Sequence, residues 1–84
     1  MPNWPDWYDW DLEFNAHLEE RMKDRGFDEV DLRLMIETAV GFRQDHVEGR
    51  WIIDAYHDGR AWEVIVEPLS EEQRLMVVTA YAPD

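Results

Sequence analysis

Three side chains with acid–base or phosphate-binding chemistry recur every four residues in one predicted helix. They are His17, Arg21 and Arg25, and this spacing places them along one stripe of the helix. His17 lies in the first turn, where the helix dipole disfavours the imidazolium and keeps a neutral ring available as a base. The two arginines can hold a phosphate through forked hydrogen bonds. The alternative is a solvated edge, on which both arginines pair with neighbouring acids.

A second polar group is predicted on one face of a β-hairpin, where Asp54 faces Glu63 and Arg50 faces Glu67. A crowded pair of carboxylates can act as an acid or base, or can bind a hard cation. The third reading is that the two carboxylates point apart into water.

Two hydroxyl groups, those of Thr79 and Tyr81, lie near the end of the last predicted strand. They can bind a phosphate or orient a substrate, although both residues are also good strand formers. The chain has no cysteine, no H-E-x-x-H pattern and no glycine-rich phosphate loop, so we expect no cofactor and no metal ion.

Two helices are predicted to position the first group, at residues 15–25 and 29–40. Asn15 and Asp28 are suitable N-caps, and apolar residues recur at helical spacing through both segments. Gly41 is expected to end the second helix. Residues 42–49 are then expected to form a loop, with room for a short extended piece.

Three strands are predicted at residues 50–57, 60–67 and 74–81. Asp58-Gly59 favours a two-residue type I′ hairpin between the first two. The sequence therefore predicts an α+β fold, in which two N-terminal helices pack on a three-stranded antiparallel sheet (ααβββ).

The first 14 residues differ in composition from the rest of the chain. They hold Trp4, Trp7, Tyr8 and Trp10 among aspartates, with no basic side chain. We expect a Trp/Asp-rich arm ahead of a single domain at residues 15–84. The arm has three readings: a hydrophobic strap that closes the core, a docking peptide for a partner, or a mimic of bases and phosphates that covers a binding face.

Overall composition limits the classes of partner. The net charge is −12, from 20 acidic and 8 basic residues, so the surface repels phosphate backbones except at a local cluster of arginines. No apolar run is long enough to span a membrane, and the N-terminus does not follow the pattern of a secretory signal. We therefore expect a cytoplasmic protein with no membrane partner.

Several blocks of the sequence carry a family resemblance: HLEERMKDRGF at 17–27, EVDLR at 29–33, GRW at 49–51, WEVIVEP at 62–68 and VVTAY at 77–81. Over residues 17–82 the chain resembles short bacterial proteins of an uncharacterised domain family. That family is grouped with RelE-like and barnase/EndoU-like ribonuclease toxins. The resemblance implies a helical layer followed by an antiparallel sheet whose basic and hydroxyl residues act on RNA.

By this resemblance, His17 is the general base or acid, while Arg21 and Arg50 stabilise charge on the scissile phosphate. Thr79 and Tyr81 orient that phosphate, and no metal is required. The chain departs from RelE-like toxins in its charge, since those toxins are usually basic. The resemblance thus predicts a toxin-related domain that is a metal-independent endoribonuclease, with RNA at a local arginine cluster and an antitoxin or other protein partner.

Two other hypotheses come from different classes of function. The first is a non-catalytic, dimeric interaction module that uses the Trp-rich arm and the acidic surface. The second is a metal site formed by Asp54 and Glu63.

Overall fold

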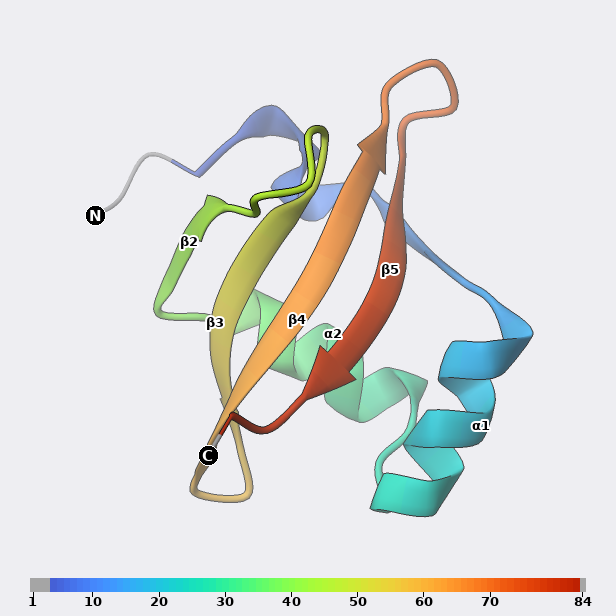
Figure 1. Ribbon diagram of the computed structural model, residues 1–84, viewed down its shortest axis with the longest axis vertical. Helices are drawn as coiled ribbons and strands as arrows, with labels where there is room; N and C mark the ends of the chain where they lie inside the picture. The colour runs from blue at the N-terminus through green and yellow to red at the C-terminus, as the bar shows by residue number, and fades with distance from the viewer. Residues whose placement is uncertain (1–3, 84) are drawn as a thin grey trace.

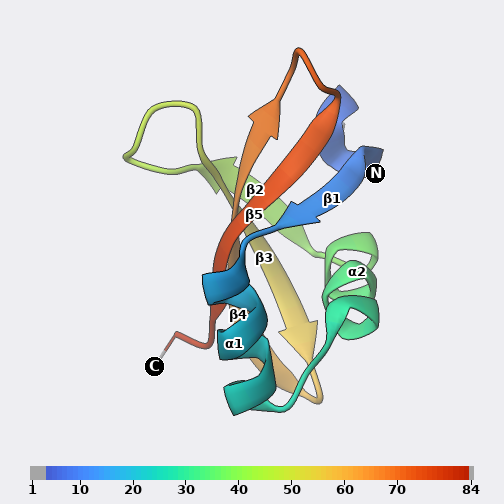
Figure 2. The same ribbon diagram turned by 90° about the vertical axis from the view of Figure 1, so that its right-hand side faces the viewer.

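A five-stranded sheet with two helices on one side forms the domain. The structure is a computed structural model that describes residues 4–83. In Figure 1, α2 lies behind the sheet and α1 lies beside the lower part of β5, and Figure 2 shows the same arrangement from the side. In chain order the elements are η1 (Asp6–Asp9), β1 (Asp11–Phe14), α1 (Ala16–Arg25), α2 (Glu29–Glu37), β2 (Gly41–Gln44), β3 (Trp51–His57), β4 (Arg60–Leu69) and β5 (Arg74–Tyr81).

The strand order is β1-β5-β4-β3-β2. The α+β class is confirmed, but the prediction of a three-stranded antiparallel sheet is wrong. The sheet has two further strands, β1 and β2, and β1 runs parallel to β5. Each added strand has four residues and lies at an edge of the sheet. Such short segments offer too few alternations of polar and apolar residues to be recognised from sequence.

The central hairpin has the predicted register. Ala55 faces Trp62 and Asp54 faces Glu63. Both turn residues have the positive φ that a type I′ turn requires, 55° at Asp58 and 78° at Gly59. The turn therefore determines which side chains of β3 and β4 reach each face of the sheet.

The first helix begins and ends close to the predicted residues. The Asn15 side chain caps it by accepting a hydrogen bond from the Leu18 amide at 2.7 Å. Gly26 ends it at φ 77°, in the left-handed conformation that glycine adopts without a steric penalty.

The second helix ends at Glu37, so its predicted end at residue 40 is wrong. Val40 is 64% exposed rather than buried on the helix, because its amide donates to the carbonyl of Asp54 at 2.9 Å. Gly41 therefore begins β2 instead of ending α2. The chain leaves the helix early because pairing with β3 satisfies its backbone groups.

Aromatic residues of the N-terminal segment complete the core; residues 1–3 of the predicted arm lie outside the described residues. Trp7 is 8% exposed, and its ring centroid lies 5.6 Å from that of Trp51 and 6.2 Å from that of Phe42. The Tyr8 hydroxyl donates to the carbonyl of Ile36 on α2. Of the three interpretations of this segment, the hydrophobic strap that closes the core agrees with the structure.

The core lies between the sheet and the helices. Its fully buried members come from both layers and include Leu18, Leu32, Met35, Ile53, Val64 and Leu75. No helix in residues 4–83 has the length and apolar character needed to cross a membrane.

Candidate functional site

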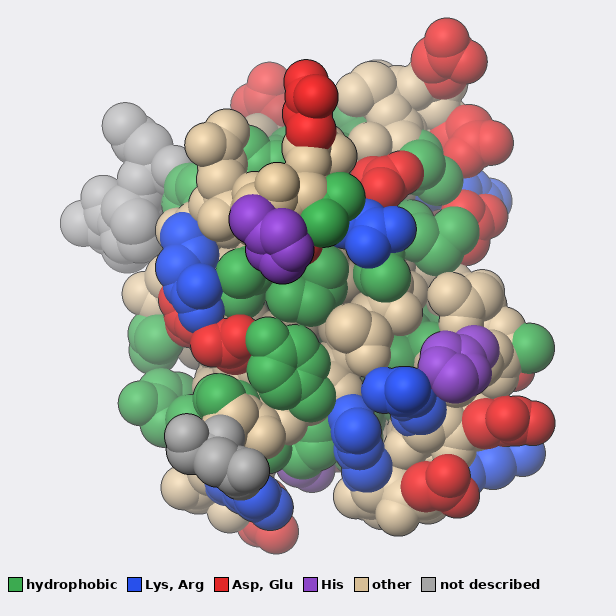
Figure 3. All heavy atoms as spheres, in the orientation of Figure 1, with side chains coloured by type: hydrophobic (Ala, Val, Ile, Leu, Met, Phe, Trp, Pro, Cys, Tyr) green, Lys and Arg blue, Asp and Glu red, His purple; other side chains and the backbone are tan. Residues whose placement is uncertain are grey.

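The face of the sheet opposite α2, here called the open face, carries the polar groups of interest. By strand register it bears Arg43, Ile52, Asp54, Tyr56, Glu63, Ile65, Thr79 and Tyr81. Figure 3 looks onto this face and shows basic side chains at several places. One of these regions lies over β2, and another follows the margin between α1 and the end of β5.

The first region contains an ionic cluster that the sequence did not predict. The Arg43 guanidinium donates to Glu63 at 2.7 Å and to both oxygens of Asp54 at 3.2 and 3.3 Å. Tyr81 donates its O–H to the other oxygen of Glu63 at 2.5 Å. We call Arg43, Asp54, Glu63 and Tyr81 the arginine–carboxylate cluster.

Arg43 changes what the two carboxylates can do. Its guanidinium lies between Asp54 and Glu63 and offsets their mutual repulsion, so it takes the place that a cation would occupy. In the described part of the chain, no three His, Cys, Asp or Glu side chains are grouped as a metal site would require. The geometry therefore favours a structural cluster over the predicted metal site at Asp54 and Glu63.

The surroundings of Tyr81 in this cluster shift its pKa. Its hydrogen bond to Glu63 raises the pKa of the Tyr81 hydroxyl above its usual value, and partial burial and the Glu63 charge add to the effect. The raised pKa means that the folded state favours the protonated hydroxyl. The stability from this bond is present below the ordinary tyrosine pKa of about 10, and it is lost as the pH rises through the folded-state pKa.

We predict that Glu63→Gln lowers the pKa of Tyr81 toward its usual value, because the substitution removes the charged acceptor. Alkaline titration of phenolate absorbance, with Tyr81→Phe subtracted to isolate this residue, measures the change. An unchanged Tyr81 midpoint in Glu63→Gln would show that the bond to Glu63 does not hold the proton. Glu67→Gln removes one charge from the same face and is the matched control, with no shift expected.

The second region is built from α1 and β5. Two fixed points align them: Phe14, just before α1, lies beside Val77 in the sheet, and Arg25, at the end of α1, donates to the carbonyl of Ala80. The pairing of β1 with β5 ends at Val77. Along the rest of β5, α1 lies where a neighbouring strand would otherwise pair. His17 and Arg21 come between the two fixed points in the chain, which places them along this margin.

The structure thus places four of the five predicted site residues on two adjoining elements, α1 and β5. His17 is exposed and Arg21 is half-buried on α1, while Thr79 and Tyr81 come from the adjoining part of β5. The Thr79 hydroxyl oxygen is buried and has no hydrogen-bond partner among the described residues.

The fifth predicted residue lies apart. Arg50 precedes β3 and donates to Glu67 at 3.3 Å, as the hairpin register predicted. Glu67 faces Met76, near the start of β5, whereas Tyr81 faces Glu63 near its end. Arg50 is therefore at the opposite end of the open face from the α1 margin.

Sequence reasoning missed two arginines. Arg43 lies in the segment expected to be a loop with a short extended piece, and the alternation of Phe42 inward and Arg43 outward there is a strand signal. The expected repulsion between Asp54 and Glu63 was a second signal, since such a pair calls for a nearby cation. Arg60 was read only as a hairpin end, and it lines a hollow with Arg25.

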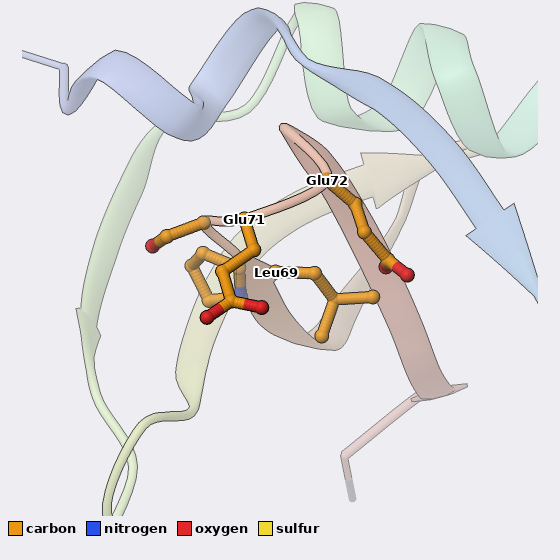
Figure 4. Close-up of a pocket in the computed structure, with 5 residues that line it drawn as sticks. Leu69, Glu71 and Glu72 are labelled. Atoms are coloured by element: carbon orange, nitrogen blue, oxygen red, sulfur yellow. The ribbon is translucent and has the colours of Figure 1, made fainter.

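A hollow at the β4–β5 turn has no convergent polar groups. It has a volume of about 400 Å³ and is formed by one local segment, the β4–β5 turn. In Figure 4, the carboxylates of Glu71 and Glu72 lie on either side of Leu69 and do not converge. A smaller hollow of about 290 Å³ is lined by Arg25, Arg60, Trp62 and Ala82, and it adjoins the α1 margin.

In comparisons with protein-family models, curated proteins and solved structures, nothing matched this chain. The case for a function therefore depends on the geometry of the described residues.

Proposed function

We propose that this chain is a toxin-related domain that cleaves RNA without a metal ion, at the margin between α1 and the end of β5. One observation supports the proposal: α1 lies along β5, because Phe14 pairs with Val77 and Arg25 donates to the carbonyl of Ala80. His17 and Arg21 on α1 and the two hydroxyls of β5 therefore come from adjoining elements that are distant in the sequence. The family resemblance of residues 17–82 assigns the same side chains to RNA.

Metal-free cleavage of RNA needs few groups. The ribose 2′-oxygen attacks the adjacent phosphorus, the bond to the 5′-oxygen breaks, and a 2′,3′-cyclic phosphate forms. One proton leaves the 2′-hydroxyl and one is given to the departing 5′-oxygen. His17 is the side chain suited to move a proton, and Arg21 faces the charge that develops on the phosphate oxygens.

The hydroxyls of Thr79 and Tyr81 on β5 differ in their hydrogen bonds. The Thr79 hydroxyl is buried without a hydrogen-bond partner among the described residues, so a phosphate oxygen can reach it only where the surrounding structure opens. Tyr81 already donates to Glu63, so only its lone pairs can contact substrate while that bond persists. Arg50, at the far end of the open face, can contact only RNA that extends along the sheet.

Local charge makes the margin accessible to an anion despite the net charge of −12. The described residues show no ion pair for Arg21, Arg25 or Arg60, whereas Arg43 and Arg50 are each paired with acids. The acidic remainder of the surface still repels long polyanions. We therefore expect a short or structurally selected RNA to be the substrate, with binding that weakens steeply as salt increases.

The proposal is tested with purified protein and a panel of single-stranded and hairpin RNAs, in EDTA. We expect cleavage to persist in EDTA and to yield 2′,3′-cyclic phosphate ends, with growth arrest when the protein is expressed. Cleavage of no RNA in the panel, together with normal growth, would contradict the proposal.

A second function, a non-catalytic interaction module, is favoured by one observation. Val30 and Leu34 are 74% and 57% exposed and lie one turn apart on α2, so they form an apolar pair on the outer side of the helix. Such a pair suits contact with a second copy or with a protein partner such as an antitoxin. If Leu34→Lys leaves the molar mass measured by light scattering unchanged, self-association through this pair is excluded.

A further inference from the structure

A small hollow joins the end of α1 to the β3–β4 turn. It has a volume of about 290 Å³, and its lining includes Arg25 and Arg60, which are 35 positions apart in the sequence. We call it the Arg25–Arg60 pocket. Two guanidinium groups at one hollow repel each other unless an anion lies between them.

Neither arginine forms an ion pair within residues 4–83, where only Arg43 and Arg50 are paired with acids in this way. Arg25 uses one amino group to bond the carbonyl of Ala80. This bond fixes the guanidinium and leaves its other N–H donors available. The chain has 20 acidic residues, so two arginines without an acid at the same hollow are unexpected unless they serve a ligand.

Trp62 and Ala82 form the apolar part of the pocket lining. Trp62 is 7% exposed and packs edge-on against Phe27 at 5.1 Å and His57 at 6.1 Å between ring centroids. Its indole N–H is buried without a hydrogen-bond partner among the described residues. An apolar wall limits water around a bound anion and strengthens its attraction to the arginines.

We propose that the Arg25–Arg60 pocket holds a phosphate of the RNA strand adjacent to the scissile phosphate. This inference rests on the proposed function and names a subsite for its substrate. Arg25 follows Arg21 by one helical turn, about 6 Å along the axis, so neighbouring phosphates of one strand can contact successive arginines of α1. Forked guanidinium groups are well suited to phosphate oxygens.

Binding is tested first with inorganic phosphate, by amide and indole NMR shifts at low salt. We expect shifts at Arg25, Arg60 and the Trp62 indole, and affinity about tenfold lower or worse in Arg60→Gln. Arg74→Gln is the matched control, since it removes the same charge from an exposed arginine at the start of β5. Equal losses of phosphate affinity in the two variants would overturn the proposed binding at the pocket, because affinity would then depend on net charge alone. Shifts spread over all exposed arginines would indicate an adventitious ion only, and would also overturn it.

Cleavage is tested next with dinucleotides that carry or lack one extra phosphate at the 5′ or the 3′ end. We expect the extra phosphate at one end to raise kcat/KM about tenfold in the wild type and in Arg74→Gln, but not in Arg60→Gln. If the extra phosphate does not change kcat/KM, the proposed subsite is overturned while the proposed function stands. No cleavage at all would overturn the proposed function, and with it the role of the pocket toward RNA. Arg60-dependent phosphate shifts would then still establish an anion site.

Discussion

Replacing Trp7 with alanine is expected to lower the free energy of unfolding by about 3–5 kcal/mol. Trp7 is 8% exposed and lies in the buried core, although it comes from the segment before the first strand. Its ring contacts Trp51 and Phe42, so the truncation leaves a cavity between η1 and the sheet. A domain of this size shifts its Tm by about 4–8 °C for each kcal/mol. Thermal or urea unfolding followed by circular dichroism measures the loss.

Trp4→Ala is the matched control, because Trp4 is only half-buried. Its ring packs on Tyr8 and Phe42 at 4.3 and 5.0 Å between centroids, so a smaller loss is expected. If Trp7→Ala unfolds with the same midpoint as the wild type, the N-terminal segment does not complete the core. Trp7→Phe, which keeps an aromatic ring, is expected to retain part of the stability.

Replacing His17 with alanine is expected to lower the rate of RNA cleavage by about 10²–10⁴-fold, the usual contribution of a general acid or base. His17 is exposed in the first turn of α1, so the fold should tolerate the change. Single-turnover cleavage of a labelled RNA measures the chemical step directly.

His46→Ala provides the comparison for His17→Ala. The His46 side chain is 91% exposed and pairs with Asp45 in the β2–β3 connection. We expect His46→Ala to cleave at the wild-type rate. Equal activity of the two variants would mean that His17 does not transfer the proton, whatever else the margin binds.

The β3–β4 hairpin was predictable because local and long-range signals agree there. Asp58-Gly59 determines the turn, and the alternation of apolar residues on both sides requires the same register. The caps of both helices were likewise local signals, read from Asn15 and Asp28.

The edge strands were not predictable from local sequence. Asp11–Phe14 pairs with Arg74–Val77, about 60 positions later in the chain, so only the complete fold determines the partner of this strand. The end of α2 was missed for a similar reason, since the amide of Val40 bonds a carbonyl of β3. A tertiary hydrogen bond there outweighed the helical pattern of side chains.

In the candidate site too, some features follow from local sequence and others depend on tertiary contacts. The stripe of His17, Arg21 and Arg25 followed from helical spacing, and the Arg50–Glu67 pair followed from the register. The Arg43 contacts to Asp54 and Glu63 depend on β2, and the pairing of Arg25 with Arg60 at one pocket depends on how α1 meets the turn. Both sets of contacts join different elements, so the spacing of residues within one element does not predict which side chains meet.

The most direct test of the RNA site is an NMR titration with a short RNA whose 2′-oxygens are methylated, because this RNA binds without being cleaved. The account predicts amide shifts confined to α1, to Thr79–Tyr81 and to the Arg25–Arg60 pocket, and losses of these shifts in Arg21→Gln. Shifts that fall instead on η1, β2 or the exposed side of α2, with α1 and the end of β5 unperturbed, would contradict it.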